Sequence, residues 1–398
     1  MGSSLPNLEW LVLAENRISG PIPSSITNAS KLIILDMPGN SFSGSRPFFG
    51  NLKLLELLDV ARSTSGNISG VIPSEIGNIS SLLNIFLDGN HLSGAIPPTI
   101  GKMKQLQRLY LSDNQLIGSI PNDLCRLYHL EELSLARNML VGPIPECLGD
   151  VKSLRLINLG SNLLNSTIPP SLWIITDLVI LSLSSNHLSG QLSSQVDNLK
   201  MINSLDLSSN KFSDVIPSSI LGCESLTFLS LSNNMFSGSI PQSFGDVKGL
   251  TTLDLSYNNL SRPSFLKTLM FQTTNWREKF QMGGNFHNFT ALSFSHNLDL
   301  CGPIQFQVAP CPENHHGLWL KKLMVPTGIL VVIVVIVMLV LMRMRKRKKV
   351  ELSANISTME CGIFSYIEPE RGTSSFSVIK LLGRGSFGSV YEAILSDG

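Results

Sequence analysis

The chain is poor in charge: Asp, Glu, Lys and Arg make up 15% of its 398 residues, and the net charge is only +1. Without a basic excess there is no electrostatic case for nucleic acid, so we expect no nucleic-acid partner. Six Cys are too few for a disulfide-rich scaffold. The 31 Gly and 21 Pro together lie near the protein average, which excludes collagen-like and low-complexity chains. A hydrophobic content of 43% excludes a wholly disordered chain.

What the chain does have is a repeat, LxxLxLxxN, through its first 262 residues. Eight of the ten intervals between its Asn positions are 24 residues long. Alternating Leu residues predict a short strand with one buried face, and strands at a fixed period stack into one parallel ladder. The Asn after each strand is expected to hydrogen-bond backbone groups that would otherwise be buried and unpaired. The Asn position falls at Asn16, Asn40, Ser63, Asn90, Asn114, Asn138, Asn162, Asn186, Asn210, Asn234 and Asn258.

Ile-Pro follows eight of the eleven strand patterns, usually after a Gly, as in Gly94-Ala95-Ile96-Pro97. Gly permits positive φ and Pro fixes φ, so each return path should be extended and sharply turned. The combined pattern resembles the plant-type leucine-rich repeat, which implies an α/β-type leucine-rich-repeat solenoid of about eleven repeats over residues 1–262. The sequence opens inside a repeat without a signal peptide, so we expect an N-terminal truncation.

Residues 263–312 form a degenerate repeat followed by a segment that resembles the C-terminal cap of such ectodomains. For residues 271–282 two explanations stay open: a divergent capping coil, or a repeat displaced by a frameshift or mispredicted splice in the coding sequence. The cap resemblance implies a disulfide between Cys301 and Cys311 in an oxidising compartment. Cys125, Cys147 and Cys223 lie singly in repeats, and we expect them to be buried free thiols.

A short extracellular segment, 313–322, precedes a 20-residue apolar run without charge at 323–342. Its length fits the hydrocarbon core of a bilayer, which predicts one transmembrane helix. Six Lys or Arg at 343–349 against two at 321–322 place the C-terminal side in the cytoplasm. The basic run serves as a stop-transfer signal and could also contact anionic membrane lipid. With the repeats outside, the predicted glycosylation sites are Asn28, Asn67, Asn78, Asn165, Asn259 and Asn288.

After a basic and Ser-rich linker, 343–375, residues 376–398 contain a GxGxxGxV pattern. Together with the span, this segment resembles the start of a plant leucine-rich-repeat receptor-like serine/threonine kinase, which implies ATP and Mg²⁺ in the intact family. The chain stops before the phosphate-pairing Lys and the HRD and DFG motifs, so we expect no catalytic residue, no activity and no bound ATP in this fragment. The residues of the phosphate loop are Gly383, Gly385, Ser386, Phe387, Gly388 and Val390.

Exposed strand positions of the solenoid should form a concave binding face, and in the first six repeats they include aromatic and charged residues. Such side chains supply most binding energy in interfaces, so they predict a ligand site, against the alternative of a merely solvated face. The candidate residues are Phe86, Arg108, Tyr110, Asp113, Glu132 and Arg137. The family resemblance implies a single-pass plasma-membrane receptor for an extracellular peptide, protein or microbial pattern, with a possible leucine-rich-repeat kinase as co-receptor. The alternative is a kinase-less receptor-like binding protein or the product of a truncated pseudogene.

Overall fold

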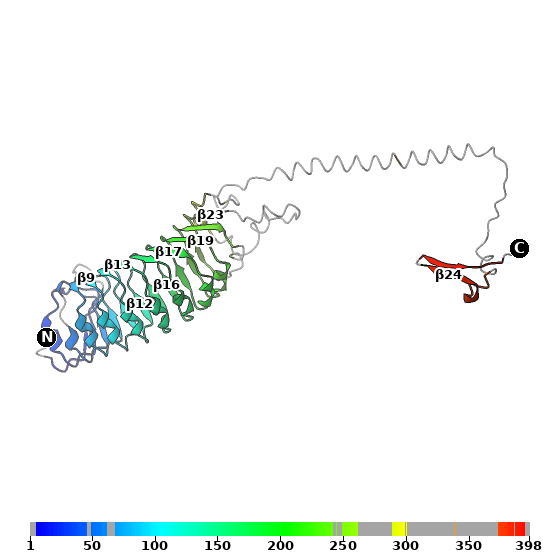
Figure 1. Ribbon diagram of the computed structural model, residues 1–398. Coiled ribbons are helices and arrows are strands. Elements are labelled where there is room, and N and C mark those ends of the chain that lie inside the picture. The colour runs from blue at the N-terminus through cyan, green and yellow to red at the C-terminus, as the bar shows by residue number, and fades with distance from the viewer. Residues whose placement is uncertain are drawn as a thin grey trace. The chain divides into compact units, whose positions relative to one another are not determined.

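The computed structural model describes residues 5–45, 49–61, 68–241, 244, 249–261, 289–298, 300, 338, 373–385 and 387–394. The chain divides into two compact units, Met1–Pro312 and Glu313–Gly398, which are described separately. The first is a stack of coils, each with a strand, a turn, usually a second strand and a short helical segment (Figure 1).

One parallel sheet of eleven strands runs through the whole stack. Equivalent residues of successive coils pair in register, so that Leu109 of β10 lies beside Ile85 of β8 and Leu133 of β12. The central residue of each strand points into the core, and its neighbours point outward. This confirms the predicted parallel ladder. The strands are β1 Trp10–Val12, β3 Ile34–Asp36, β6 Leu57–Asp59, β8 Asn84–Phe86, β10 Arg108–Tyr110, β12 Glu132–Ser134, β14 Leu156–Asn158, β16 Ile180–Ser182, β18 Ser204–Asp206, β20 Phe228–Ser230 and β22 Thr252–Asp254.

In most coils from the second onward, an Asn after the strand links neighbouring coils through its side-chain amide. Asn138 Nδ2 donates to the carbonyl of Leu111 in the preceding coil at 3.0 Å, and to the carbonyls of Leu135 and Ala136 in its own coil at 3.0 and 3.1 Å. Its Oδ1 accepts from the backbone N–H of Leu116 at 2.9 Å. The same four bonds recur at Asn114, Asn162, Asn186 and Asn210, which confirms the predicted role of this position.

The ladder continues past Asn258 to a twelfth coil, which lies in the segment 263–312 predicted to hold a degenerate repeat and a C-terminal cap. Asn297 Nδ2 donates to the Leu255 carbonyl at 3.0 Å, and its Oδ1 accepts from the Leu260 N–H at 3.0 Å. The Tyr257 and His296 rings stack with centroids 3.9 Å apart. Residues 289–297 therefore form the coil that packs against the end of the repeats, while 262–288, including the segment with two open explanations, lie outside the described residues.

The return paths form a second parallel sheet of ten strands. Gly94 and Gly238, each with a φ of 72°, turn the chain as the Gly-x-Ile-Pro pattern predicted. That these segments also pair with one another was not predicted. The strands are β5 Gly44–Ser45, β7 Ile68–Val71, β9 His91–Ala95, β11 Gln115–Gly118, β13 Met139–Gly142, β15 Leu163–Ser166, β17 His187–Gln191, β19 Lys211–Val215, β21 Met235–Ser239 and β23 Asn259–Ser261; β2 Ser19–Gly20 and β4 Ser41–Phe42 form a separate pair.

The first nine coils each close with a short 3₁₀-helix. This corrects the α/β-type description, because within residues 5–300 the helical segments that the structure describes are not α-helices. The next buried side chain comes three residues after the Pro, as Ile100 does after Pro97, and an i→i−3 bond, here Ile100 N–H to Pro97 O at 3.1 Å, closes so short a segment. These closing helices are η1 Ser24–Asn28, η2 Phe49–Asn51, η3 Ser74–Asn78, η4 Pro98–Lys102, η5 Asn122–Arg126, η6 Glu146–Asp150, η7 Pro170–Ile174, η8 Ser194–Asn198 and η9 Ser218–Gly222. A further 3₁₀-helix, η13 Ala291–Phe294, packs against β22 in the position that a strand takes in the other coils, where Leu255 N–H donates to the Ser293 carbonyl at 2.8 Å.

Neighbouring 3₁₀-helices approach so closely that some contacts require glycine. A Cβ on Gly101 would lie 2.4 Å from the Asp123 carbonyl oxygen. We therefore expect Gly101→Ala to lower the free energy of unfolding of this region by about 1–3 kcal/mol, because the backbones must separate. Hydrogen exchange of the full chain measures the loss. Gly249→Ala is the matched control, since its Cβ would stand 3.4 Å from the Leu226 carbonyl oxygen. Equal losses of stability in the two variants would contradict the conclusion that the contact at Gly101 requires glycine.

The described part of the second unit is an antiparallel hairpin, β24 Leu381–Gly385 with β25 Gly388–Tyr391, preceded by the 3₁₀-helix η15 Val378–Lys380. Gly385 pairs with Gly388, so the predicted phosphate loop lies at the hairpin tip. Within the described residues, no helix is long and apolar enough to cross a membrane. The predicted span at 323–342 lies outside the described residues except for Met338.

Candidate ligand-binding face

Four of the six candidate residues, Phe86, Arg108, Tyr110 and Glu132, lie on three adjacent strands of the eleven-stranded sheet. In register, Asn84, Arg108 and Glu132 form one row, and Phe86, Tyr110 and Ser134 form the next. Because alternate strand residues share a face, the outward side chains of both rows stand on the same surface. We call this surface, formed by Asn84, Phe86, Arg108, Tyr110 and Glu132, the strand patch.

Hydrogen bonds join the polar members of the strand patch. Tyr110 Oη donates to Glu132 Oε2, and Arg108 Nε donates to Glu132 Oε1 at 3.3 Å. Arg108 Nη1 donates to Asn84 Oδ1 at 3.3 Å. The Phe86 and Tyr110 rings meet edge to face, with centroids 5.1 Å apart and planes at 89°. The patch is therefore held in one arrangement by bonds that run across three coils.

Burial and the bond to Glu132 raise the pKa of Tyr110 to about 12, with burial the larger cause. The phenol consequently stays protonated across the physiological pH range and keeps its donor role toward Glu132. All five side chains of the strand patch remain partly exposed, so a ligand could still reach the Phe86 ring and the Arg108 guanidinium.

Asp113 and Arg137 form a second, separate pair. Each precedes the ladder Asn of its coil and has a positive φ, of 54° and 52°. Arg137 Nη1 contacts Asp113 Oδ1 at 3.0 Å, and both side chains are well exposed. Exposed ion pairs of this kind contribute about 0–1 kcal/mol. The six predicted residues thus divide into four on the strand patch and two at the turn beside it, and Asn84 is the member that sequence reasoning missed.

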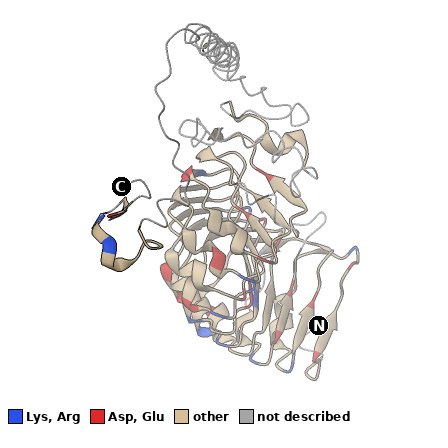
Figure 2. Ribbon diagram, turned by 90° about the vertical axis from the view of Figure 1, so that its right-hand side faces the viewer, with Lys and Arg blue, Asp and Glu red and all other residues tan. Residues whose placement is uncertain are grey.

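Other acidic residues, Asp36 and Asp59, lie on the same sheet toward the N-terminus. Figure 2 shows Asp and Glu as red segments on strands near that end of the chain. Toward the C-terminus the row of Tyr110 continues with small polar or acidic residues, whereas the row of Arg108 includes the apolar Leu156, Ile180 and Phe228. There the side chains bond one another, as Ser208 Oγ does to Asp206 Oδ1 at 2.6 Å. Within the described strands, the combination of aromatic rings with Arg and Glu is therefore concentrated in coils 4–6.

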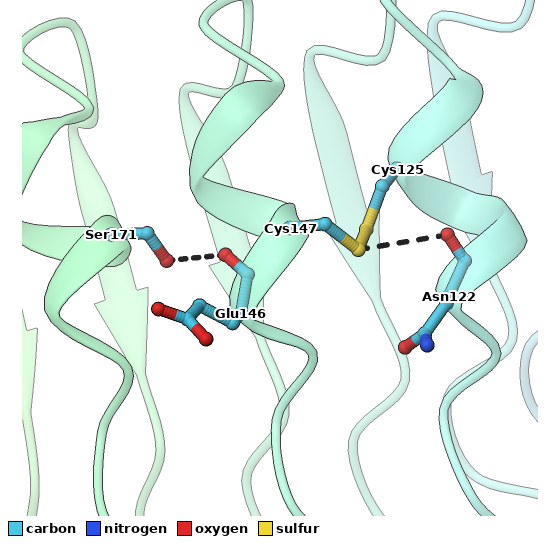
Figure 3. Close-up of a disulfide and its surroundings, with 5 residues drawn as sticks. All are labelled: Asn122, Cys125, Glu146, Cys147 and Ser171. Carbon is cyan, nitrogen blue, oxygen red and sulfur yellow. Dashed lines mark hydrogen bonds between the residues drawn. A yellow bond between two sulfur atoms is a disulfide. The ribbon is translucent and has the colours of Figure 1, made fainter.

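Cys125 and Cys147 form a disulfide, which corrects the prediction of free thiols for these two residues (Figure 3). Their Cα atoms are 5.6 Å apart, on η5 and η6 of successive coils. The spacing of 22 residues equals the spacing at which Gly101 faces Asp123 and Gly149 faces Ser171. Cys125 takes the glycine position, and Cys147 takes the position that faces it. Cys223 is buried and free as predicted.

Replacing this disulfide by the pair used in the next coil, Cys125→Gly with Cys147→Ser, should lower the free energy of unfolding by about 3 kcal/mol, because the bond closes a loop of about 22 residues in the unfolded chain. Chemical denaturation of the full chain measures the loss. Mass spectrometry without reduction should recover the Cys125 and Cys147 peptides linked in the parent chain. Recovery of both thiols alkylated would contradict the pairing.

Some of the remaining predicted sites lie within the described residues, and others lie outside them. Asn28, Asn78, Asn165 and Asn259 are exposed, as glycosylation requires. Asn67, Asn288, Cys301, Cys311 and Ser386 lie outside the described residues. Gly383, Gly385, Phe387, Gly388 and Val390 lie on the hairpin, and the Phe387 side chain is fully exposed at its tip.

The fold and its sequence pattern define a leucine-rich-repeat solenoid. The family description "Leucine rich repeat" matches residues 7–29, 105–127, 129–151, 176–236 and 200–260. The chain therefore carries leucine-rich repeats, and its structure matches ectodomains of plant leucine-rich-repeat receptors.

Three relatives illustrate the match. Receptor-like protein 39 of Arabidopsis thaliana is 37% identical over 91 residues, which are 22% of this chain and 10% of that protein. The plant peptide hormone receptor RGFR1, solved with RGF2, is 36% identical with a TM-score of 0.62, over 65% of this chain and 41% of that one. The Arabidopsis receptor kinase HAESA, solved with the peptide hormone IDA and the co-receptor SERK1, is 31% identical with a TM-score of 0.59, over 75% and 51%. The chain thus spans about half or less of each relative.

Proposed function

We propose that this chain belongs to a plant membrane receptor whose repeats bind a peptide outside the cell and whose cytosolic part is a serine/threonine kinase. The strand patch carries the proposal. It combines two aromatic rings with a guanidinium, a carboxylate and an amide on one rigid sheet face, and such side chains supply most of the binding energy at interfaces. The similar receptors RGFR1 and HAESA were solved with peptide hormones, and HAESA also with a co-receptor.

An extracellular position for the repeats is supported by the disulfide between Cys125 and Cys147, because disulfides persist in oxidising compartments. The four exposed sequons agree with it. The apolar run at 323–342 and the basic residues after it would anchor the chain in the plasma membrane, with the basic side toward anionic lipid. Protease protection of the tagged C-terminus in intact cells, with the repeats cleavable from outside, tests this topology.

The kinase part of the proposal is supported by the glycine pattern on the hairpin. A Cβ on Gly383, Gly385 or Gly388 would meet no other atom within 4 Å, so the described hairpin does not itself form a cradle around a phosphate. It also lacks the Lys, Asp and Asn groups that hold ATP and Mg²⁺ in protein kinases. We therefore derive no phosphoryl transfer from these residues. Sequencing the transcript beyond codon 398 distinguishes the two alternatives. An open reading frame that encodes a strand with the phosphate-pairing Lys, followed by HRD and DFG motifs, supports the kinase. A stop codon supports a kinase-less receptor-like protein.

The ligand class is tested by titrating the purified full chain with a panel of synthetic plant peptide hormones that includes RGF2 and IDA. At least one peptide should bind with a dissociation constant of about 1 μM or tighter, and its scrambled sequence should not. Absence of binding across the panel, or equal binding of a scrambled peptide, would contradict the proposed function.

A further inference from the structure

Four apolar side chains are exposed together on the outer face of the ten-stranded sheet, away from the strand patch. They are Ile117 of β11, Met139 and Val141 of β13, and Leu163 of β15, and each is between 43% and 48% exposed. Their neighbours along the strands, Leu116, Leu140 and Leu164, are fully buried. Because successive side chains of a strand point to opposite faces, these four side chains point toward solvent. We call this group the lateral patch; β13 is labelled in Figure 1.

The lateral patch is continuous. Ile117 is the register partner of Met139, and Val141 is the register partner of Leu163. Met139 and Val141 are two residues apart on one strand and therefore on one face. The four side chains thus form a single diagonal across three neighbouring strands rather than four scattered exposures, and contiguous apolar surface of this kind marks an interaction site in soluble domains.

The composition of the lateral patch departs from the rest of the repeat. Where coils 5 and 6 carry Ile117 and Val141, coil 7 carries Asn165 and the other coils carry Ser. Where coils 6 and 7 carry Met139 and Leu163, most others carry polar residues. Met235 shares the second position, but its register partner is Ser213. Because this repeat folds with Ser in place of Ile117 and Val141, the apolar residues are not needed for the coil itself. The Ser equivalents are Ser19, Ser43, Ser69, Ser93, Ser189, Ser213, Ser237 and Ser261.

We propose that the lateral patch is a homotypic contact, covered by the same patch of a second copy of this chain. The segments of β11, β13 and β15 contain no charged residue, so two copies meet without like-charge repulsion and without a charge pattern that would select a different partner. A two-fold axis in the interface sets Ile117 of each copy against Leu163 of the other, with Met139 and Val141 at the centre. Four half-exposed side chains per copy make a small apolar core, which fits a weak and transient contact.

The test uses the purified full chain in detergent micelles, with sedimentation measured over a range of concentrations. The parent chain should show a monomer–dimer equilibrium in the micromolar range. Ile117→Ser with Val141→Ser, which restores the residue of other coils, should weaken dimerisation by about tenfold or more, because apolar area is lost from both copies. Val215→Ser is the matched control: Val215 is an exposed apolar residue of β19, outside the patch, and its replacement should leave the equilibrium unchanged.

A glycan on Asn165 would lie on the same face of β15, two residues beyond Leu163, so the measurements are repeated with Asn165→Gln. The proposal is supported if the chain dimerises with Asn165 or with Asn165→Gln, and if adding Ile117→Ser and Val141→Ser to the same chain abolishes dimerisation. A parent that stays monomeric in both backgrounds, a double variant that dimerises as the parent does, or a control variant that weakens equally would overturn it. Because no ligand is involved, none of these outcomes depends on the peptide-binding function.

Discussion

Asn138→Ala is expected to lower the local free energy of unfolding of coils 5 and 6 by about 3 kcal/mol or more. The Leu116 N–H is buried, and Asn138 Oδ1 is its hydrogen-bond acceptor, so the substitution leaves this donor unpaired at a cost of about 1–3 kcal/mol. Three further bonds from Asn138 Nδ2 are lost, each worth about 0.5–1.5 kcal/mol. The Leu111 carbonyl keeps a second amide donor from Asn114, and the Leu135 carbonyl keeps one from Asn162. These remaining bonds limit the loss of stability.

Hydrogen exchange of the full chain is the appropriate measurement, because each coil contacts only its neighbours and the loss should spread no further than the adjacent coils. Asn16→Ala is the matched control. Asn16 is exposed and donates to two carbonyls of its own coil, Leu13 and Ala14, at 3.0 and 2.9 Å. Its replacement should cost about 1 kcal/mol or less. A loss at Asn16 as large as at Asn138 would show that the bond between coils is not the source of stability.

The sequence predicted the ladder because two periodic signals agree in it: Leu at alternate strand positions and Asn after the strand. It failed at the twelfth coil, where Asn297 follows Asn258 by 39 residues instead of 24. The structure places Asn297 by its hydrogen bonds, which do not depend on the length of chain between the coils. The second sheet was missed for a different reason, since extended backbone after a Gly does not by itself specify a pairing partner.

The disulfide was missed because Cys125 and Cys147 were considered one at a time. Their separation of 22 residues was the available signal. It differs from the 24-residue repeat and equals the sequence separation of Gly149 and Ser171, where a Cβ on the glycine would meet the backbone of the next coil. A pattern built on the repeat period alone cannot show this, because the contact joins two different positions of successive coils.

At the strand patch, the sequence identified the aromatic and charged residues because most of the equivalent positions in later repeats are Ser, Asn, Asp or Thr. It could not separate Asp113 and Arg137 from the others, since the residue before the ladder Asn is neighbouring in sequence but lies at the turn. It also passed over Asn84, because Asn is frequent throughout these repeats. The contacts of Arg108 with both Asn84 and Glu132 became visible only when three coils were stacked in register.

Tyr110→Ala and Arg108→Ala are each expected to weaken binding of the best peptide of the panel by about 30-fold or more. Tyr110 loses its ring contact with Phe86 and its bond to Glu132, and Arg108 loses the link between Asn84 and Glu132. Loss of a central aromatic or Arg side chain from an interface costs about 2 kcal/mol or more. Tyr110→Phe keeps the ring and removes the hydroxyl donor, so comparison with Tyr110→Ala separates ring contact from positioning of Glu132.

Ser182→Ala and Ser230→Ala are the matched controls, because they occupy the row of Tyr110 on strands β16 and β20 without aromatic neighbours in that row. Neither should change the affinity by more than about twofold. If Tyr110→Ala and Arg108→Ala bind the peptide as tightly as the controls do, the strand patch is a solvated face and the ligand lies elsewhere on the solenoid. If the controls weaken binding as strongly, the peptide follows the whole row, and the aromatic residues mark one part of a longer site.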